Sequence, residues 1–267
     1  MKDFTLNIYK QLLQILISKN YIFFTVEEYF KLYVSKSPNR PFILMRHDVD
    51  RKPNNSLRMA KLENELGVKA TYYFRTIPKT FKPEIIKEIA ELGHEIGYHY
   101  ENLCEIGDKV KGKSEKEIYK LALEDFIENL AILRQIVPIK NIAMHGRPTS
   151  KWDSRLLWNK YNYKKYGILS EPYFDIDFNK VFYITDAGRS WNNERVNLRD
   201  KVESKFNFTF NHTENIIQAL NQDKLPNKIM INIHPEHWAD SQTEWYKIWV
   251  IRKAKNTVKK LIIRNKI

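Results

Sequence analysis

Short apolar runs alternate with amphipathic stretches along the chain. The runs are rich in β-branched and aromatic residues, which favour strands, whereas the stretches between them carry apolar residues at helical spacing. Strands are predicted at 42–46, 68–74, 94–99, 141–144, 166–169, 181–185, 206–210 and 229–233. Helices are predicted at 53–66, 83–92, 114–136 and 152–158, from 213 and from about 242. This alternation predicts an α/β fold.

Ionisable residues follow the predicted strands where each strand ends. They are Asp48, Asp50, His99, His145, Asp186, His212 and His234. The carboxyl ends of parallel strands meet at one edge, and α/β enzymes place their chemistry there. The pattern is therefore typical of a barrel-like α/β enzyme.

The stretch from Ile43 to Asp50 is the most informative strand end. Asp48 and Asp50 are two residues apart, so both point to the same side of an extended chain. Two such carboxylates repel each other unless their roles differ, and a cation on one of them leaves the other as a base. Four histidines at strand ends, together with carboxylates, suit Zn, Fe, Co or Ni. A divalent-metal site is predicted, against the alternative of solvated loop acids and hydrogen-bonded turn histidines.

The chain is expected to form a single domain of residues 1–267, because it has no internal repeat, low-complexity segment or Gly/Ser linker. Residues 1–39 are predicted to be a helical N-terminal extension, with a capping box at Thr25-Val26-Glu27-Glu28. Residues 40–240 would form the barrel. Residues 241–267 are predicted to form a basic C-terminal helix that contains tryptophan.

The composition limits the cellular compartments and the classes of partner that fit the protein. One cysteine, Cys104, excludes an internal disulfide framework and fits a reducing compartment. No apolar stretch approaches ~20 residues, and the N-terminus lacks the pattern of a signal peptide, so a cytoplasmic protein is expected. The net charge is +13, but the lysines are dispersed and no nucleic-acid-binding motif is present. A solvated basic surface is favoured over nucleic-acid binding.

Three motifs then suggest a family. They are His47-Asp48-Val49-Asp50, the run Gly93–His99 that follows Ala70–Phe74, and Ile231–His234. In this order they resemble the motifs of the NodB-type polysaccharide deacetylases, carbohydrate esterase family 4, and most closely a divergent branch with a His-Asp-Val-Asp signature. The resemblance spans about residues 42–238 and implies a distorted (β/α)7 barrel. Some members of that branch occur among genes for cell-surface polysaccharides.

The resemblance also implies roles for single residues. Asp48 matches the base, Asp50 and His99 match metal ligands, and His234 matches the histidine of the last motif, which we expect to protonate the leaving group. The second histidine of the family's second motif is missing, because Leu103 occupies its position. His145 is the preferred replacement, and Glu101 is the second choice.

The substrate side of the site is expected to be formed by later motifs. Met144–Pro148 keeps the family's Arg-Pro and adds a histidine, so Arg147 or Arg189 could hold the base or a substrate anion. Asp186–Trp191 resembles the Asp/Trp motif that lines the family's pocket and orients the acid. Glu101 is also a candidate for substrate contact. Four aromatic residues could either stack on a sugar or be buried in the core: Tyr98, Tyr100, Trp191 and Trp238.

Three functions remain open from the sequence. The first is a metal-dependent hydrolase, with Zn as the preferred ion and Co, Ni or Fe as alternatives, that removes an N-acetyl or O-acetyl group from a sugar or glycan precursor. The second is a catalytically degenerate, deacetylase-like carbohydrate- or metal-binding protein, which the Leu103 departure favours. The third is a basic adaptor for a membrane surface or nucleic acid, built on the C-terminal helix. Peripheral membrane contact through that helix is compatible with the first.

Overall fold

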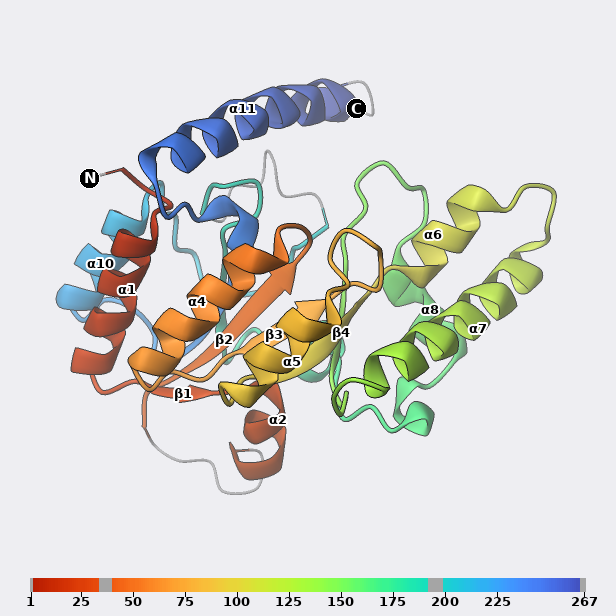
Figure 1. The fold of residues 1–267 in the computed structure, drawn as a ribbon, viewed down its shortest axis with the longest axis horizontal. Helices are drawn as coiled ribbons and strands as arrows, with labels where there is room; N and C mark the ends of the chain where they lie inside the picture. The colour runs from red at the N-terminus through yellow and green to blue at the C-terminus, as the bar shows by residue number, and fades with distance from the viewer. Residues whose placement is uncertain (1, 34–39, 192–198, 265–267) are drawn as a thin grey trace.

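A seven-stranded parallel sheet forms the centre of the fold (Figure 1). The computed structural model describes residues 2–33, 40–191 and 199–264, with residues 33 and 258–264 described by their backbone alone. The strands are β1 (Ile22–Phe24), β2 (Phe42–Val49), β3 (Thr71–Phe74), β4 (Glu95–Tyr100), β5 (Ile142–Met144), β6 (Phe182–Thr185) and β7 (Lys228–Ile233). The α/β class predicted from the sequence is confirmed.

The strand β2 organises the sheet. The order is β5-β4-β3-β2-β7-β6, and β1 pairs with β2 off this path. Along one side of β2, β1 pairs with the first half of the strand and β3 with the second half, while β7 runs along the other side. Every residue of β2 is buried, as a strand covered on both faces requires. The ends of β4 and β5 therefore lie to one side of the end of β2, and those of β7 and β6 lie to the other.

The sheet is a curled half-barrel, in agreement with the distorted barrel predicted from the motifs. Among the described residues, β5 and β6 form its two edges and no ladder joins them. Helices α4 and α5 lie in front of β2 and β3, and α11 crosses one end of the fold (Figure 1). The main helices are α1 (Leu6–Ser18), α4 (Pro53–Glu65), α5 (Pro83–Glu91), α6 (Asn102–Lys109), α7 (Glu115–Arg134), α10 (Thr213–Asn221) and α11 (Gln242–Arg264).

Shorter helices fill the connections. They are α2 (Val26–Glu28), the π-helix η1 (Tyr29–Tyr33), α8 (Leu157–Lys160), α9 (Pro172–Asp175) and the 3-10 helices η2 (Ser154–Leu156), η3 (Tyr163–Tyr166) and η4 (Pro235–His237). The helix predicted at 152–158 corresponds to η2 followed by α8. Helix α6 was not predicted.

The N-terminal segment is less purely helical than predicted. Helix α1 begins after Thr5, whose side chain accepts a hydrogen bond from the backbone N–H of Ile8. The capping box at Thr25 and Glu28 is present. Between the two helices, however, β1 adds to the central sheet by parallel pairing with β2. The segment therefore forms part of the sheet as well as an additional helical layer.

Two predicted strands are absent from the sheet. At 166–169, η3 ends at Tyr166 and is followed by Gly167, whose φ of +71° breaks extended backbone. Ser170 forms a single bridge to Asn141. Residues 206–210 form no ladder, although Phe206 and Phe208 pack on Phe182. Alternation of aromatic residues with period two indicated a strand there, but packing on the core explains the same pattern.

Helix α11 begins at Gln242, as predicted, and packs through part of one face. Ile248 is buried, and the indole N–H of Trp245 donates to the carbonyl of Asp3 at 2.6 Å. Trp249, whose ring stacks on that of Trp245, is 42% exposed. In the described part of the chain, every helix is too short or too polar to cross a bilayer.

Candidate active site

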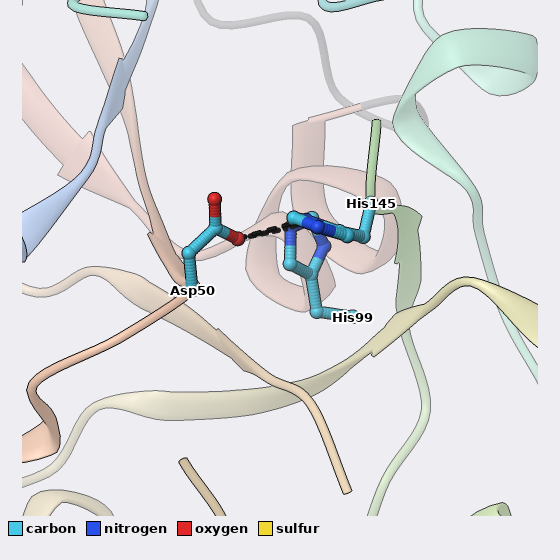
Figure 2. Close-up of side chains that lie close together, drawn as sticks. All are labelled: Asp50, His99 and His145. Atoms are coloured by element: carbon cyan, nitrogen blue, oxygen red, sulfur yellow. Dashed lines mark hydrogen bonds and ion pairs between the residues drawn. The ribbon is translucent and has the colours of Figure 1, made fainter. Parts of the chain in front are cut away.

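Asp50, His99 and His145 converge at the carboxyl ends of three strands (Figure 2). Asp50 follows β2, His99 lies in β4, and His145 follows β5. Oδ1 of Asp50 is 2.8 Å from Nδ1 of His145 and 3.3 Å from Nε2 of His99. The ligand atoms of the three residues lie within 4.8 Å of one another. We call these three residues the metal triad.

The hydrogen bonds behind the metal triad suit a bound cation. Nδ1 of His99 lies 2.9 Å from the carbonyl oxygen of Ala143 and must donate to it, so Nε2 carries the lone pair that faces the triad. His145 is held by its backbone N–H, which donates to Tyr100 at 2.8 Å. One carboxylate and two imidazoles form a donor set that fits Zn, Co, Ni or Fe.

The charge state of Asp50 also fits a ligand. Burial alone would raise the pKa of its carboxyl, but the neighbouring His145 and His99 hold that pKa well below its usual range. The carboxylate is therefore ionised at neutral pH, as metal binding requires.

Asp48 is buried beside the metal triad but belongs to a different hydrogen-bond network. The guanidinium of Arg46 donates to both carboxylate oxygens, at 2.8 and 2.9 Å, and the side-chain amide of Asn232 donates to Oδ2 at 3.0 Å. Burial raises the pKa of Asp48, but Arg46, His99 and His234 outweigh it and lower that pKa. Asp48 is thus an ionised carboxylate that Arg46 orients. Its Oδ2 lies 3.7 Å from Nε2 of His99.

On the opposite side, Asp186 after β6 holds His234 after β7. Oδ1 of Asp186 lies 2.7 Å from Nδ1 of His234 and accepts from its backbone N–H at 2.9 Å. Oδ2 accepts from the indole of Trp238 at 2.8 Å. Burial opposes the charged imidazole, but Asp186 raises the pKa of His234 to about 10. His234 is therefore a protonated, oriented imidazolium.

A second histidine in this region, His237, was not predicted. Its Nδ1 lies 3.4 Å from Oδ2 of Asp186, and its side chain is fully buried. Burial first, and then the charge of Arg252, lower its pKa to about 3. His237 is therefore neutral, whereas its neighbour His234 is charged.

One cavity joins the two sides. Residues from both line it: Asp48, Asp50, His99, His145, His234 and His237. We call the part around β2, β4 and β5 the metal wall and the part around Asp186 and His234 the acid wall. A molecule in this cavity would contact an ionised carboxylate, three candidate ligands and a protonated imidazole at once.

The structure separates the two candidates for the missing second-motif histidine. Leu103 is fully buried in α6, so its position offers no ligand. His145 lies in the metal triad. Glu101 instead forms an ion pair with Arg75, and its nearest approach to His145 is 4.0 Å. Glu101 thus lies behind His145, where its charge can orient the imidazole, and is absent from the cavity lining.

Neither arginine predicted for substrate binding lines the cavity. Arg147 is half-buried and lies 3.4 Å from Asp108 and 4.0 Å from Glu101. Arg189 is half-buried outside the cavity lining, with its guanidinium 5.5 Å from the ring centre of Phe4 and 4.7 Å from that of Trp245. The cations that do line it are Arg199 and Arg252, from segments with no sequence motif to mark them.

The aromatic residues proposed to stack on sugar are all buried. Tyr98, Tyr100, Trp191 and Trp238 are at most 2% exposed. The Trp191 indole donates to Thr213, and Trp238 donates to Asp186. They shape the core and position the acid wall, because no face is free for a ligand. His212, another strand-end prediction, is an exposed residue preceding α10 and lies outside the cavity lining.

Arg46 is the site residue that the sequence could have identified. It lies two positions before Asp48 on the same strand, so both side chains point to one side. His47, between them, points the other way and pairs with Glu63 at 2.6 Å under α4. The first motif therefore places alternate residues in the cavity and in the core.

Comparison with known proteins gives matches at the level of structure only. No family model and no curated protein matches the sequence. The deacetylase PplD of Streptococcus pyogenes, in complex with acetate, matches with a TM-score of 0.47 and 14% identity, over 80% of this chain and 86% of that one. PdaA of Bacillus subtilis, a family 4 carbohydrate esterase, gives a TM-score of 0.39 and 12% identity over 92% and 84% of the two chains.

BA3943 of Bacillus anthracis, a pseudoenzyme of the same family, gives a TM-score of 0.43 and 14% identity over 82% of this chain. The chain spans only 62% of that protein's length. The matches fall in the family that the motifs resemble, carbohydrate esterase family 4. At this sequence identity the similarity concerns the fold alone and does not extend to the activities of these proteins.

Proposed function

We propose that this protein is a metal-dependent hydrolase that removes an acetyl group, N-linked or O-linked, from a sugar or glycan precursor. The observation that carries the proposal is the cavity itself. An ionised carboxylate, Asp48, lies beside the metal triad, and a protonated histidine, His234, lines the same cavity from the acid wall. Hydrolysis of an amide or ester needs a base and an acid on either side of the reacting carbonyl.

The residues take distinct roles in this reaction. Asp50, His99 and His145 would hold a divalent ion, which would supply activation of water and polarisation of the acyl oxygen. Asp48 accepts the proton of the attacking water as the new carbon–oxygen bond forms. His234 donates its proton to the departing sugar nitrogen or oxygen as the bond to the acyl carbon breaks, and Asp186 keeps it charged and oriented. Arg46 keeps Asp48 ionised and fixed in place.

Three finer points belong to the proposal. Zinc is the preferred ion, since it accepts carboxylate and imidazole without a strong geometric demand, and cobalt, nickel or iron would fit the same donors. A cytoplasmic location suits the single buried cysteine. A role in making cell-surface polysaccharide follows from the motif resemblance.

The test combines metal analysis with a product assay. Protein purified without added metal is analysed for bound ions, stripped with a chelator and reloaded, and acetate release is measured with chitooligosaccharides and with nucleotide-linked N-acetyl sugars. We expect acetate release that disappears on stripping and returns with metal. Stoichiometric metal without acetate release from any acetylated sugar would instead identify a degenerate binding protein.

A further inference from the structure

Five polar side chains share one face of three neighbouring strands. Thr185 of β6 and Asn232 of β7 are register partners, and Asn232 is in turn the partner of Arg46 in β2. Tyr183 precedes Thr185 by two residues and Asp48 follows Arg46 by two, so alternation along each strand puts them on the same face. The base Asp48 is therefore one end of a polar group that crosses the sheet.

Asp200, a residue of the cavity lining, joins this group from outside the sheet. Its Oδ1 accepts hydrogen bonds from the hydroxyls of Tyr173 and Tyr183. Its Oδ2 accepts from the hydroxyl of Thr185 at 2.7 Å and from the side-chain amide of Asn232 at 3.3 Å. A carboxylate has about four lone-pair sites, so Asp200 has little capacity left for a sugar hydroxyl or a metal ion.

The amide of Asn232 is shared between two carboxylates. Its Nδ2 donates to Oδ2 of Asp48 at 3.0 Å as well as to Asp200. Both acceptors require the N–H groups to face them, which turns the carbonyl of Asn232 away. That carbonyl oxygen is buried and has no hydrogen-bond partner in the described part of the chain, which costs free energy. Asp48 and Asp200 together hold the amide against this cost, and without Asp200 one carboxylate would have to hold it alone.

A second route connects Asp200 to the base. The guanidinium carbon of Arg46 lies 4.9 Å from the ring centre of Tyr173 and 5.3 Å from that of Tyr73. These aromatic rings stabilise the cation that donates to both oxygens of Asp48. Because Asp200 accepts from the hydroxyl of Tyr173, it fixes one of the two rings.

The neighbouring Arg199 anchors Asp200 to the metal wall. The guanidinium of Arg199 donates to the carbonyl of Ser150 at 2.8 Å. A Cβ added to Gly146, which follows the triad residue His145, would lie 2.6 Å from the Cβ of Arg199. Only glycine permits so close an approach of the two segments. Asp200 is thus held between the metal wall and the strands β6 and β7.

We propose that Asp200 is a positioning residue for the base Asp48 and acts on it through Asn232 and Tyr173. The inference rests on the proposed deacylation, in which Asp48 must meet the attacking water in one orientation. A displacement of ~1 Å in such a group can lower a rate by ~10²-fold. Because the hydrogen bonds of Asp200 are already made within the protein, its loss should change kcat rather than KM.

The first test measures turnover in two backgrounds. Asp200→Ala should keep stoichiometric metal, lower kcat about 10–100-fold and leave KM within about twofold, and Asp200→Asn, which keeps one acceptor oxygen, should fall between it and the wild type. In the Asp48→Asn background, Asp200→Ala should lower the residual kcat by less than about twofold, because the base through which it acts is already absent. The same fold-change in both backgrounds, or an effect mainly on KM, overturns the inference.

The second test needs no turnover. The urea midpoints of metal-free wild type, Asp48→Asn, Asp200→Ala and the double variant are compared, and the two changes should not be additive, because both carboxylates bind one amide. The control is Asp125→Ala, which removes a half-buried carboxylate that accepts from the amide of Asn102 on another face of the molecule, and it should add to Asp48→Asn.

The outcomes of the two tests are distinct. Additive changes in the midpoint for Asp48 and Asp200 overturn the inference. Non-additive changes in a wild type that releases no acetate overturn the proposed function but leave Asp200 as the anchor of Asp48. If Asp200→Ala does not fold, Asp200→Asn replaces it in both tests with the same expected signs.

Discussion

The two walls of the cavity each include an Asp-His-His cluster, and the two clusters differ in chemistry. Each contains one aspartate and two histidines whose ligand atoms lie within 4.8 Å of one another. On the metal wall, His99 donates to a backbone carbonyl through Nδ1, which leaves Nε2 free to bind an ion. On the acid wall, Asp186 already accepts from the imidazole and backbone of His234 and from Trp238.

The difference lies in the neighbours of each carboxylate rather than in the ligands themselves. Asp186 is saturated by N–H donors, so it stabilises a proton on His234 and has little capacity left for a cation. Oδ1 of Asp50 instead faces ring nitrogens of His145 and His99, at 2.8 and 3.3 Å. The comparison teaches that the surrounding hydrogen bonds decide whether an Asp-His-His cluster holds a metal or a proton.

The difference between the two walls is tested most directly by substituting residues of each wall. Asp50→Ala and His99→Ala should each lose the bound metal and all turnover while the protein remains folded, because the cation depends on three donors. Asp186→Asn should keep stoichiometric metal. Metal analysis of each variant measures the bound ion, and circular dichroism measures the fold. Retention of metal by either metal-wall variant would refute the assignment.

Metal analysis also distinguishes the role of His145 from that of Glu101. His145→Ala should behave like the other ligand variants. Glu101→Gln removes only a charge behind the imidazole and should weaken metal binding by about 10–100-fold, as outer-shell changes commonly do. A larger loss in Glu101→Gln than in His145→Ala would reverse the two roles.

Asp48→Asn should leave the metal in place and lower kcat by about 10²–10⁴-fold, since it removes a base and not a ligand. It also leaves the buried Arg46 without its partner, so the melting temperature should fall. Loss of metal together with activity would mean that the roles of Asp48 and Asp50 are exchanged.

His234→Gln should keep the metal and slow turnover by about 10²-fold, with the largest effect on substrates whose leaving group needs a proton. In the wild type, activity should fall at alkaline pH, as the imidazolium with a pKa of about 10 loses its proton. The variant should lack this alkaline limb in its kcat profile.

The same raised pKa predicts a pH-dependent stability. The stabilisation from the charged imidazole is complete below its ordinary pKa of 6.5 and is lost as pH rises through about 10. In metal-free protein, the free energy of unfolding of the wild type relative to His234→Gln should therefore decline between these values. A flat difference would show that Asp186 does not hold a charged imidazole.

The smallest effect is expected for peripheral membrane contact through α11, a possibility that the sequence left open. Tyr246, Trp249, Val250 and Ile251 are exposed there, and basic residues follow them in the sequence. Each basic residue near an anionic bilayer contributes ~1 kcal/mol. Removal of residues 257–267, which keeps Arg252 and Asn256, should weaken co-sedimentation with anionic liposomes. Equal binding by both forms, or none by the full chain, removes the membrane role.

The strand ends could be predicted from the sequence because their signal is local. An apolar run that stops at a charged residue identifies a buried strand and its reactive end, and β2, β4, β5, β6 and β7 were all found in this way. The spacing of Asp48 and Asp50 places both on one side of the chain wherever that strand lies. The metal triad and the Asp186–His234 pair contain only residues from these strand ends.

Contacts between distant segments were decided only by the tertiary structure. Arg189 and Trp191 follow Asp186 closely in the sequence, yet their side chains pack beside Phe4 rather than in the cavity. Arg252, far away in α11, reaches the cavity instead. No periodicity in the sequence encodes such a contact, because it depends on how a terminal helix packs across the sheet. The sequence determined which residues are chemically active, and the packing decided which of them share a cavity and which atoms their partners leave free.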